Sequence, residues 1–286
     1  MATPRYTEAV VTLVDILGFR EILKHKSPKT VLNYLSRKDS FHTRRWSSSR
    51  VGFRSHSFSD LIVTCLPLQK KIVSRGSLFR VYEEVLRIGC NQARLAISGV
   101  FVRGGLTIGP VYSSPKHVFG PALVTAYDVE RSIAKWPVIA VDCYVTNILL
   151  ESIPECLNQV KPNYNFVRDG PSELHIIAMI FSQLRQALDR TYFIDYLSCL
   201  AYEDQTTGDL LYYLKDHKKT LVKALSDTPN KKLYFVARYH NSSSKYYYPD
   251  LQDLLIPGFG VPPRPGWPSA LRAGFETLGF HAPALA

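Results

Sequence analysis

The sequence predicts an α/β (or α+β) protein in which a mixed sheet is flanked by helices and followed by a helical C-terminal extension. In the first 150 residues, short runs rich in β-branched residues alternate with longer segments of helical apolar spacing. The chain has 286 residues, of which 46% are apolar and 21% are charged, a composition that excludes a disordered chain. This length and apolar content suffice for one large core or two modest ones.

The first elements are a strand, a helix and a hairpin. The run VVTLVD (Val10–Asp15) predicts a buried strand. Residues 19–38 have helical spacing, with a break near Pro28. Residues 51–67 have strand composition on both sides of a Ser-Asp pair, so we expect a hairpin with Asp60 near its tip.

Four further elements complete the first half of the chain. They are helices over residues 78–96 and 121–134 and strands over residues 98–112 and 137–142. The pair Gly104–Gly105 interrupts the longer strand, which predicts a close approach of another backbone.

The second half is less regular. Residues 172–188 and 210–225 have helical spacing, and an aromatic run lies between them. We therefore expect three parts: a domain over residues 1–150, a helical extension packed on it over 151–255, and a Pro/Gly-rich tail over 256–286.

The net charge of +11 suits a polyanionic ligand, either a nucleoside triphosphate or a nucleic acid. Much of the excess lies in residues 37–54, which are typical of a solvated loop or of a nucleic-acid contact. The five cysteines form no CxxC pair. Neither a signal peptide nor a run of about 18 apolar residues is visible, so we expect a cytoplasmic protein without a membrane span.

Two aspartates are candidate metal ligands. Asp15 ends the first strand, where a following glycine and a helix N-terminus suit a bound phosphate. If the hairpin lies beside that strand, Asp15 and Asp60 can share hard divalent cations. Taken singly, Asp15 is also typical of a helix cap and Asp60 of a turn.

Four motifs follow one another over roughly residues 10–142. They are TLVDILGF, SFSDLIV, RGGLTIG and GPALVTA. In this order they resemble the class III nucleotidyl cyclases, although each alone is a weak signal. Within that family, FSD, RGG and FGPAL-x-x-AY-x-x-E resemble the Pycsar antiphage pyrimidine cyclases.

The resemblance implies a class III cyclase-like sheet and a role for each site residue. Asp15 and Asp60 would bind two Mg²⁺ or Mn²⁺ ions with the help of the Ile16 carbonyl. Backbone amides would hold the triphosphate, at Leu17, Gly18 and Phe19.

The sequence departs from the family pattern at four positions. His56 and His117 replace the lysine and the acid that read a purine, which leaves a pyrimidine base open. Each histidine is equally typical of a buried structural residue. Val124 and Asp128 replace the helix asparagine and arginine, so a transition-state cation must come from elsewhere. Its candidates are Arg54, Arg103 and Lys135, and Arg103 is equally suited to brace the sheet.

The resemblance therefore implies a lyase that converts UTP, or alternatively CTP, to cyclic UMP or cyclic CMP and pyrophosphate. It also implies a homodimer with the active site between two copies, and a separate effector protein that the product activates during phage infection. A degenerate cyclase-like domain that binds nucleotide as a sensor or scaffold is the alternative. Nucleic-acid binding through the basic segment is a third possibility.

Overall fold

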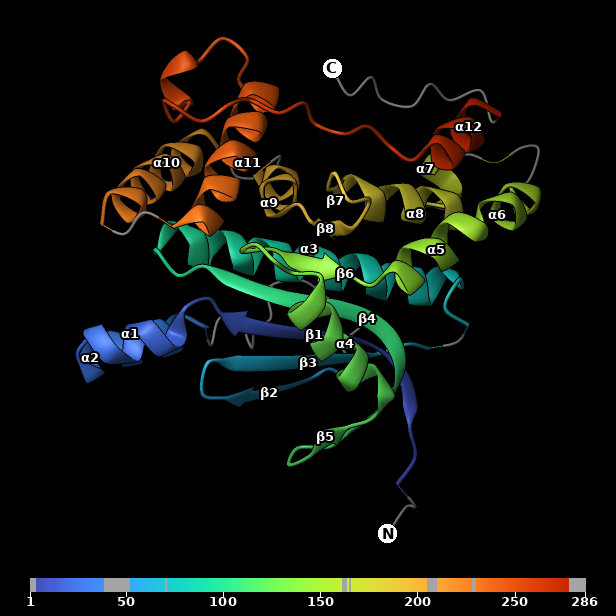
Figure 1. Ribbon diagram of the computed structural model, residues 1–286. Helices are drawn as coiled ribbons and strands as arrows, with labels where there is room; N and C mark the ends of the chain where they lie inside the picture. The colour runs from blue at the N-terminus through green and yellow to red at the C-terminus, as the bar shows by residue number, and fades with distance from the viewer. Residues whose placement is uncertain are drawn as a thin grey trace.

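The computed structural model describes residues 4–38, 52–69, 71–160, 164, 166–204, 210–227 and 230–277. In these ranges the chain forms one sheet with the strand order β2-β3-β1-β4-β6-β8-β7, and β5 pairs with β4 (Figure 1). β4 and β6 are parallel, and the other strand pairs are antiparallel. The predicted mixed sheet is confirmed. Its strands are β1 (Thr7–Ile16), β2 (Arg54–Phe58), β3 (Leu61–Pro67), β4 (Val102–Ser113), β5 (Val118–Phe119), β6 (Ile139–Val141), β7 (Leu184–Gln186) and β8 (Tyr192–Ile194).

Helices cover both faces of the sheet, as the sequence predicts. The longest, α3, lies between the sheet and two helices of the second half, α8 and α9 (Figure 1). On the other face, α4 packs against β4 and β1. The helices are α1 (Phe19–His25), α2 (Pro28–Lys38), α3 (Arg75–Ile97), α4 (Pro121–Ser132), α5 (Cys143–Glu151), α6 (Ile153–Gln159), α7 (Phe166–Asp169), α8 (Glu173–Ser182), α9 (Tyr196–Asp204), α10 (Leu210–Asp227), α11 (Lys231–Tyr247), the short 3₁₀ helix η2 (Gln252–Leu254) and α12 (Ser269–Thr277).

The central strand β1 shows why the sequence builds two cores. Successive side chains of a strand point to opposite faces. Val10 and Val14 join the cluster on the α3 side, whereas Val11 and Leu13 join the cluster on the α4 side. Asp15 continues the second series, so its carboxyl belongs to the face that α4 covers.

The glycine pair in β4 allows close approach on two sides, because Gly105 faces α4 and Gly104 faces β1. A Cβ at Gly105 would lie 2.2 Å from the Ala126 carbonyl oxygen of α4, and a Cβ at Gly104 would lie 2.3 Å from the Leu13 carbonyl oxygen of β1. Both distances are far below van der Waals contact, so the predicted close approach of backbone is confirmed.

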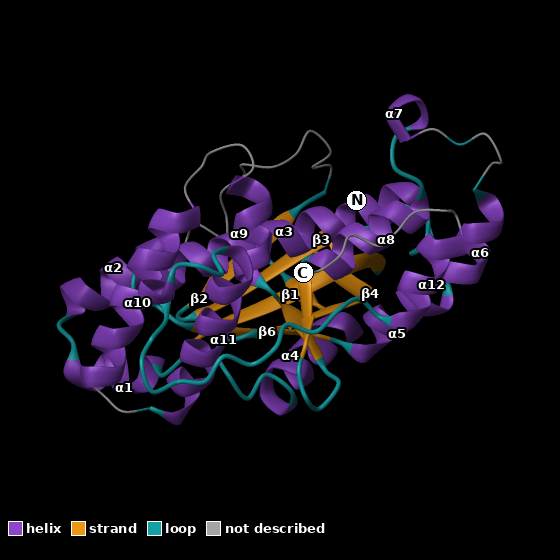
Figure 2. Cartoon of the chain, turned by 90° about the horizontal axis from the view of Figure 1, so that it is seen from above, coloured by secondary structure: helices purple, strands orange, loops and turns teal. Residues whose placement is uncertain are grey.

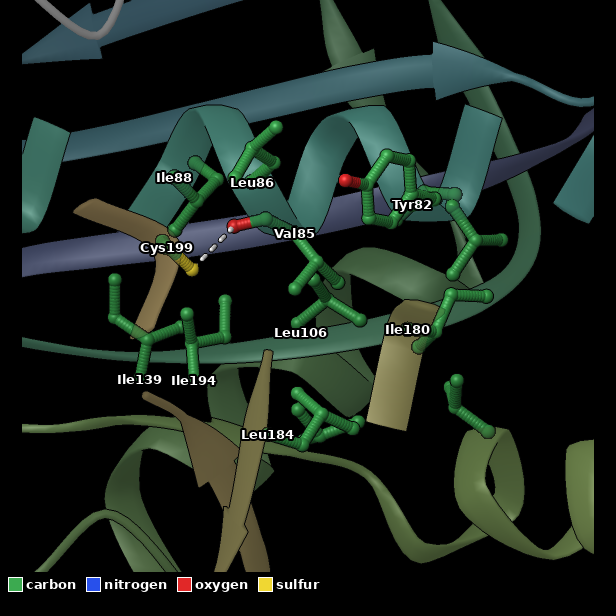
Figure 3. Close-up of a cluster of buried hydrophobic side chains, with 14 of the residues drawn as sticks. Tyr82, Val85, Leu86, Ile88, Leu106, Ile139, Ile180, Leu184, Ile194 and Cys199 are labelled. Carbon is green, nitrogen blue, oxygen red and sulfur yellow. Dashed lines mark hydrogen bonds between the residues drawn. The ribbon is translucent and has the colours of Figure 1, made fainter. Parts of the chain in front are cut away.

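The second half is helical, but it also contributes two strands. The predicted helix over 172–188 is wrong after residue 182, because the chain turns into β7, and the aromatic run begins with β8, which together extend the sheet beyond β6. Figure 2 shows the helices of this half spread over the sheet, with α10 and α11 at one end and α6 and α12 at the other. Figure 3 shows the core beneath them, where Val85 and Ile88 of α3 meet Leu106, Leu184 and Ile194 from the strands.

The predicted tail contains an ordered segment and a helix. Residues 256–268 have no helix or strand, and they run across the C-terminal helices to α12 (Figure 1). Arg264 anchors this segment through an ion pair, in which its Nη2 lies 3.2 Å from the buried carboxylate of Asp195. The same carboxylate also pairs with Arg185 at 3.1 Å. Among the helices in the described ranges, none combines the length and the apolar character that a bilayer span requires.

Candidate functional site

Asp15 and Asp60 meet at one end of the sheet. Asp15 is the penultimate residue of β1 and pairs with Leu61, the first residue of β3. Asp60 precedes Leu61 in the turn of the β2–β3 hairpin, where Ser59 adopts a positive φ of 53°. The two carboxyl groups are close enough for Asp60 to raise the pKa of Asp15. The hairpin with Asp60 near its tip is as the sequence predicts, and the hairpin does lie beside the first strand, which is the condition for the two aspartates to share cations.

The pair has the electrostatic character of a cation site. Burial, the hydrogen bond to Asp60 and the charges of Asp60 and Glu130 raise the pKa of Asp15 to about 7, while Arg103 opposes the shift. Crowded carboxylates of this kind are relieved by a proton or by a bound cation, and carboxylate oxygens are the ligands that Mg²⁺ and Mn²⁺ prefer. Within the described residues, no third His, Cys, Asp or Glu side chain joins them as a further ligand.

Arg103 lies directly opposite Asp15 on β4. Its Nε lies 3.5 Å from Asp15 Oδ2 and 2.6 Å from Glu130 Oε1. The Arg103 side chain is 29% exposed, so part of the guanidinium reaches the surface beside the two aspartates. Of the three cations proposed from the sequence, Arg103 is the one that the fold brings to the pair.

Glu130 is a site residue that the sequence interpretation missed. It belongs to the last turn of α4 and is only 4% exposed. Burial raises the pKa of its carboxyl group, and the charges of Arg103, Lys232 and Arg131 oppose that shift. The signal was present, because Glu130 follows Ala122 and Ala126 at four-residue spacing on the sheet-facing side of α4.

Two candidate cations lie elsewhere in the chain. Arg54 pairs with Cys65 at the far end of the hairpin from Asp60; four strand residues correspond to about 13 Å. Lys135 follows α4 and acts on Asp189, whose pKa is lowered first by the Thr191 hydroxyl and also by the Lys135 charge. Within one chain, neither Arg54 nor Lys135 lies beside the aspartate pair, and their candidacy as the transition-state cation stays a prediction.

The turn after β1 has the predicted shape but fewer available amides. Gly18 has a φ of 73°, which favours glycine. The Leu17 N–H donates to the Phe101 carbonyl at 2.8 Å, so it is not available to a phosphate. Gly18 and Phe19 remain as candidate phosphate donors, and Ile16 ends β1 beside Asp15.

A hollow of about 420 Å³ lies next to Asp15 on the same face of the sheet. We call it the α4 hollow. His56 lines it from β2, with Nε2 3.2 Å from the Ser113 hydroxyl oxygen. His117 is exposed in the β4–β5 turn, next to Val118 of the hollow wall. The walls are Leu13, His56, Ser57, Phe58, Leu61, Val63, Val118, Leu123, Val124 and Tyr127.

The rim of the α4 hollow is apolar and exposed. Phe58 is 81% exposed, Val124 61% and Tyr127 48%. Contiguous exposed apolar side chains mark interaction surfaces in folded proteins. Asp128 lies on the exposed side of α4 beside them. The basic segment 37–54 falls largely outside the described residues, so the nucleic-acid interpretation stays a prediction.

No family sequence profile matches the chain, and no curated protein matches it. Among the solved structures that are partly similar to the chain are two structures of bacterial light-regulated adenylyl cyclases. The first has 16% identity and a TM-score of 0.34 over 51% of this chain and 80% of that chain. The second has 16% identity and a TM-score of 0.35 over 51% of this chain and 46% of that chain. At this identity and overlap, the similarity does not identify a substrate or assign residue roles.

Proposed function

We propose that the chain is a nucleotidyl cyclase that converts UTP to cyclic UMP and pyrophosphate. The observation that carries the proposal is the Asp15–Asp60 pair, with Arg103 beside it and the α4 hollow next to it on one face of the sheet. These groups match three features of a nucleoside triphosphate. The aspartates would hold the metal ions on the phosphate chain, Arg103 would meet its negative charge, and the α4 hollow would take the base.

Each group then has a role. Divalent ions, when bound, would activate the ribose 3′-hydroxyl and stabilise the pyrophosphate leaving group. Asp15, Asp60 and the Ile16 carbonyl would hold the ions, because all three offer hard oxygen ligands. Arg103 would bind the triphosphate through the part of its guanidinium that Glu130 does not occupy. The amides of Gly18 and Phe19 would contact the same phosphates.

The α4 hollow would receive the base. Its apolar walls suit a flat ring, and the imidazole of His56 would present a polar group to a pyrimidine carbonyl. His117 would approach from the β4–β5 turn. Neither side chain matches the lysine and acid expected for a purine, so the two pyrimidine triphosphates are proposed over ATP and GTP, and UTP is taken before CTP as the substrate to test.

We also propose that the chain forms a homodimer through the same face. Phe58, Val124 and Tyr127 would be covered by a second copy, which also closes the α4 hollow from the solvent side. A role in antiphage defence, with a separate effector protein for the cyclic nucleotide, rests on the sequence motifs alone.

The alternative is a nucleotide-binding domain without turnover. Val124 is 61% exposed at the position where the resemblance expects an asparagine, and Asp128 stands where it expects an arginine. Both changes remove groups that would orient the ribose or stabilise the transition state.

The test is a product assay with the full chain. We would incubate it with ATP, GTP, CTP or UTP and Mn²⁺, and resolve products by chromatography and mass spectrometry. Asp60→Asn is the site variant, and Asp189→Asn is the matched control, because Asp189 lies on the β7–β8 turn away from the pair.

Cyclic UMP made by the control and lost in Asp60→Asn supports the cyclase. Metal-dependent binding of UTP without any cyclic product supports the alternative. Failure to bind any of the four triphosphates in the presence of Mn²⁺ overturns both.

A further inference from the structure

The end of β4 leaves the sheet and crosses the face that α4 covers. β3 and β1 lie between β2 and β4 in the sheet, so three strand spacings, about 14 Å in all, separate the two strands. His56 Nε2 of β2 nevertheless lies 3.2 Å from the Ser113 hydroxyl oxygen of β4. The pairing of β4 with β1 ends at Val111, and Tyr112 and Ser113 pair with β5 instead. Figure 1 shows β4 bending at this end towards β5, so the end of the strand folds back over the sheet.

This crossing builds one wall of the α4 hollow. Val118 of β5 pairs with Ser113, and both Val118 and His56 line the hollow. The β4–β5 hairpin also has support that does not involve the Ser113 hydroxyl, because Phe119 stacks on Tyr112 with ring centroids 4.8 Å apart. The hydrogen bond between Ser113 and His56 therefore joins two walls of the hollow, β2 and the β4–β5 hairpin.

His56 carries the polar group that the proposed function assigns to the base. Uracil and cytosine differ at one edge, where uracil has a carbonyl oxygen that accepts a hydrogen bond and cytosine has an amino group that donates one. An imidazole distinguishes the two bases only if its nitrogens stay at fixed places, because a flip of the ring exchanges nitrogen and carbon positions. Base selection by His56 therefore depends on what holds its ring.

The Ser113 hydroxyl holds the ring at Nε2. A serine hydroxyl donates or accepts, so it bonds this nitrogen in either tautomer, whereas a flipped ring would place a carbon there and lose the bond. We propose that Ser113 is a positioning residue for base selection, which fixes the orientation of His56 in the α4 hollow and so sets the preference between UTP and CTP. The proposal rests on the proposed function, because it concerns the same base site.

The test measures the affinities for UTP and for CTP in the presence of Mn²⁺ by calorimetry. Ser113→Ala removes the hydroxyl, and Ser113→Thr keeps it. Thr7→Val is the matched control, because the Thr7 hydroxyl donates to the Val111 carbonyl at 3.3 Å and supports the same end of β4 by a bond that does not involve His56. We expect the natural chain to prefer one of the two triphosphates, and Ser113→Ala to lower that preference by about 3- to 10-fold, the worth of one hydrogen bond. Ser113→Thr and Thr7→Val should keep the preference.

An equal loss of UTP and CTP affinity in Ser113→Ala would overturn the proposal, because it would show general support of the hairpin. A natural chain that does not distinguish the two triphosphates, or a loss of preference in Thr7→Val as large as that in Ser113→Ala, would also overturn it. If neither triphosphate binds, the proposed function fails, and the hold on the ring is decided by nuclear magnetic resonance. The nitrogen chemical shift of His56 Nε2 should then change in Ser113→Ala and stay constant in Thr7→Val, and an unchanged shift in Ser113→Ala refutes the hold on the ring.

Discussion

α4 packs so closely on β4 that position 105 has no room for a side chain. An alanine there would bring its Cβ within 2.2 Å of the Ala126 carbonyl oxygen and 2.9 Å of the Glu130 amide nitrogen. Both obstacles are backbone atoms of a helix, so they cannot rotate away. To restore contact, α4 must move outwards by about 1 Å, and overpacking of this size costs roughly 1–3 kcal/mol or more.

We therefore expect Gly105→Ala to lower the free energy of unfolding by about 3 kcal/mol. Gly109→Ala is the control on the same strand. Its Cβ would lie 3.3 Å from Ala122 Cβ, and the smaller unfolded-state entropy of alanine offsets about 0.5 kcal/mol. Urea unfolding followed by circular dichroism should show a midpoint about 1 M lower for Gly105→Ala and nearly unchanged for Gly109→Ala.

The same displacement should reach the site, because Glu130 moves with α4. Mn²⁺ affinity should therefore fall in Gly105→Ala under conditions where the variant is still folded, and it should stay unchanged in Gly109→Ala. Equal stability of the two variants would refute the close seating of α4. Reduced stability with unaltered Mn²⁺ binding would refute the link from α4 to the aspartate pair.

Three further predictions concern other parts of the chain. Burial lowers the pKa of His240 to about 4, so the unfolded state, with a histidine pKa of about 6.5, binds more protons between these values. Stability should thus be full above pH 6.5 and fall by about 3 kcal/mol as the pH drops towards 4, with a smaller fall in His240→Asn. Arg264→Met, which leaves Asp195 with one cation fewer, should destabilise the fold by about 3 kcal/mol in urea unfolding. Phe58→Ser should leave the fold intact and shift the chain towards a monomer in sedimentation velocity, and an unchanged dimer would contradict the proposed interface.

Local patterns predicted the parts of the fold that local chemistry determines. The β-branched run of β1 and the Ser-Asp turn of the hairpin follow from side-chain preferences, and Gly104–Gly105 marked the contact with α4. Strands of three residues, such as β7, lack enough alternation to be distinguished from the end of a helix. The apolar residues after α8 were therefore assigned to the helix, although tertiary pairing with β8 decides their structure.

The sequence predicted the site residues that lie on β1 and on the neighbouring hairpin, Asp15 and Asp60. It missed Glu130, whose place in the site depends on the packing of α4. An acid on an amphipathic helix is usually solvent-facing, so the four-residue spacing of Glu130 with Ala122 and Ala126 was not interpreted as a buried position. Leu17 is the opposite case, a residue that the sequence suggested for the site. Its turn has the shape that suits phosphate binding, but its N–H already donates to the Phe101 carbonyl oxygen.

The charges gathered at this end of the sheet also indicate how a triphosphate must bind. Asp15, Asp60 and Glu130 carry three negative charges when ionised, against one positive charge on Arg103. A triphosphate with up to four negative charges would meet a site that is already negative on balance, so its approach is unfavourable without a cation. We therefore expect UTP to bind at least tenfold more weakly in EDTA than in Mn²⁺, as measured by calorimetry. Removal of one negative charge in Asp60→Asn should reduce that dependence on metal. Equal UTP affinity with and without Mn²⁺ in the natural chain would contradict a role for the aspartate pair in holding the nucleotide through metal.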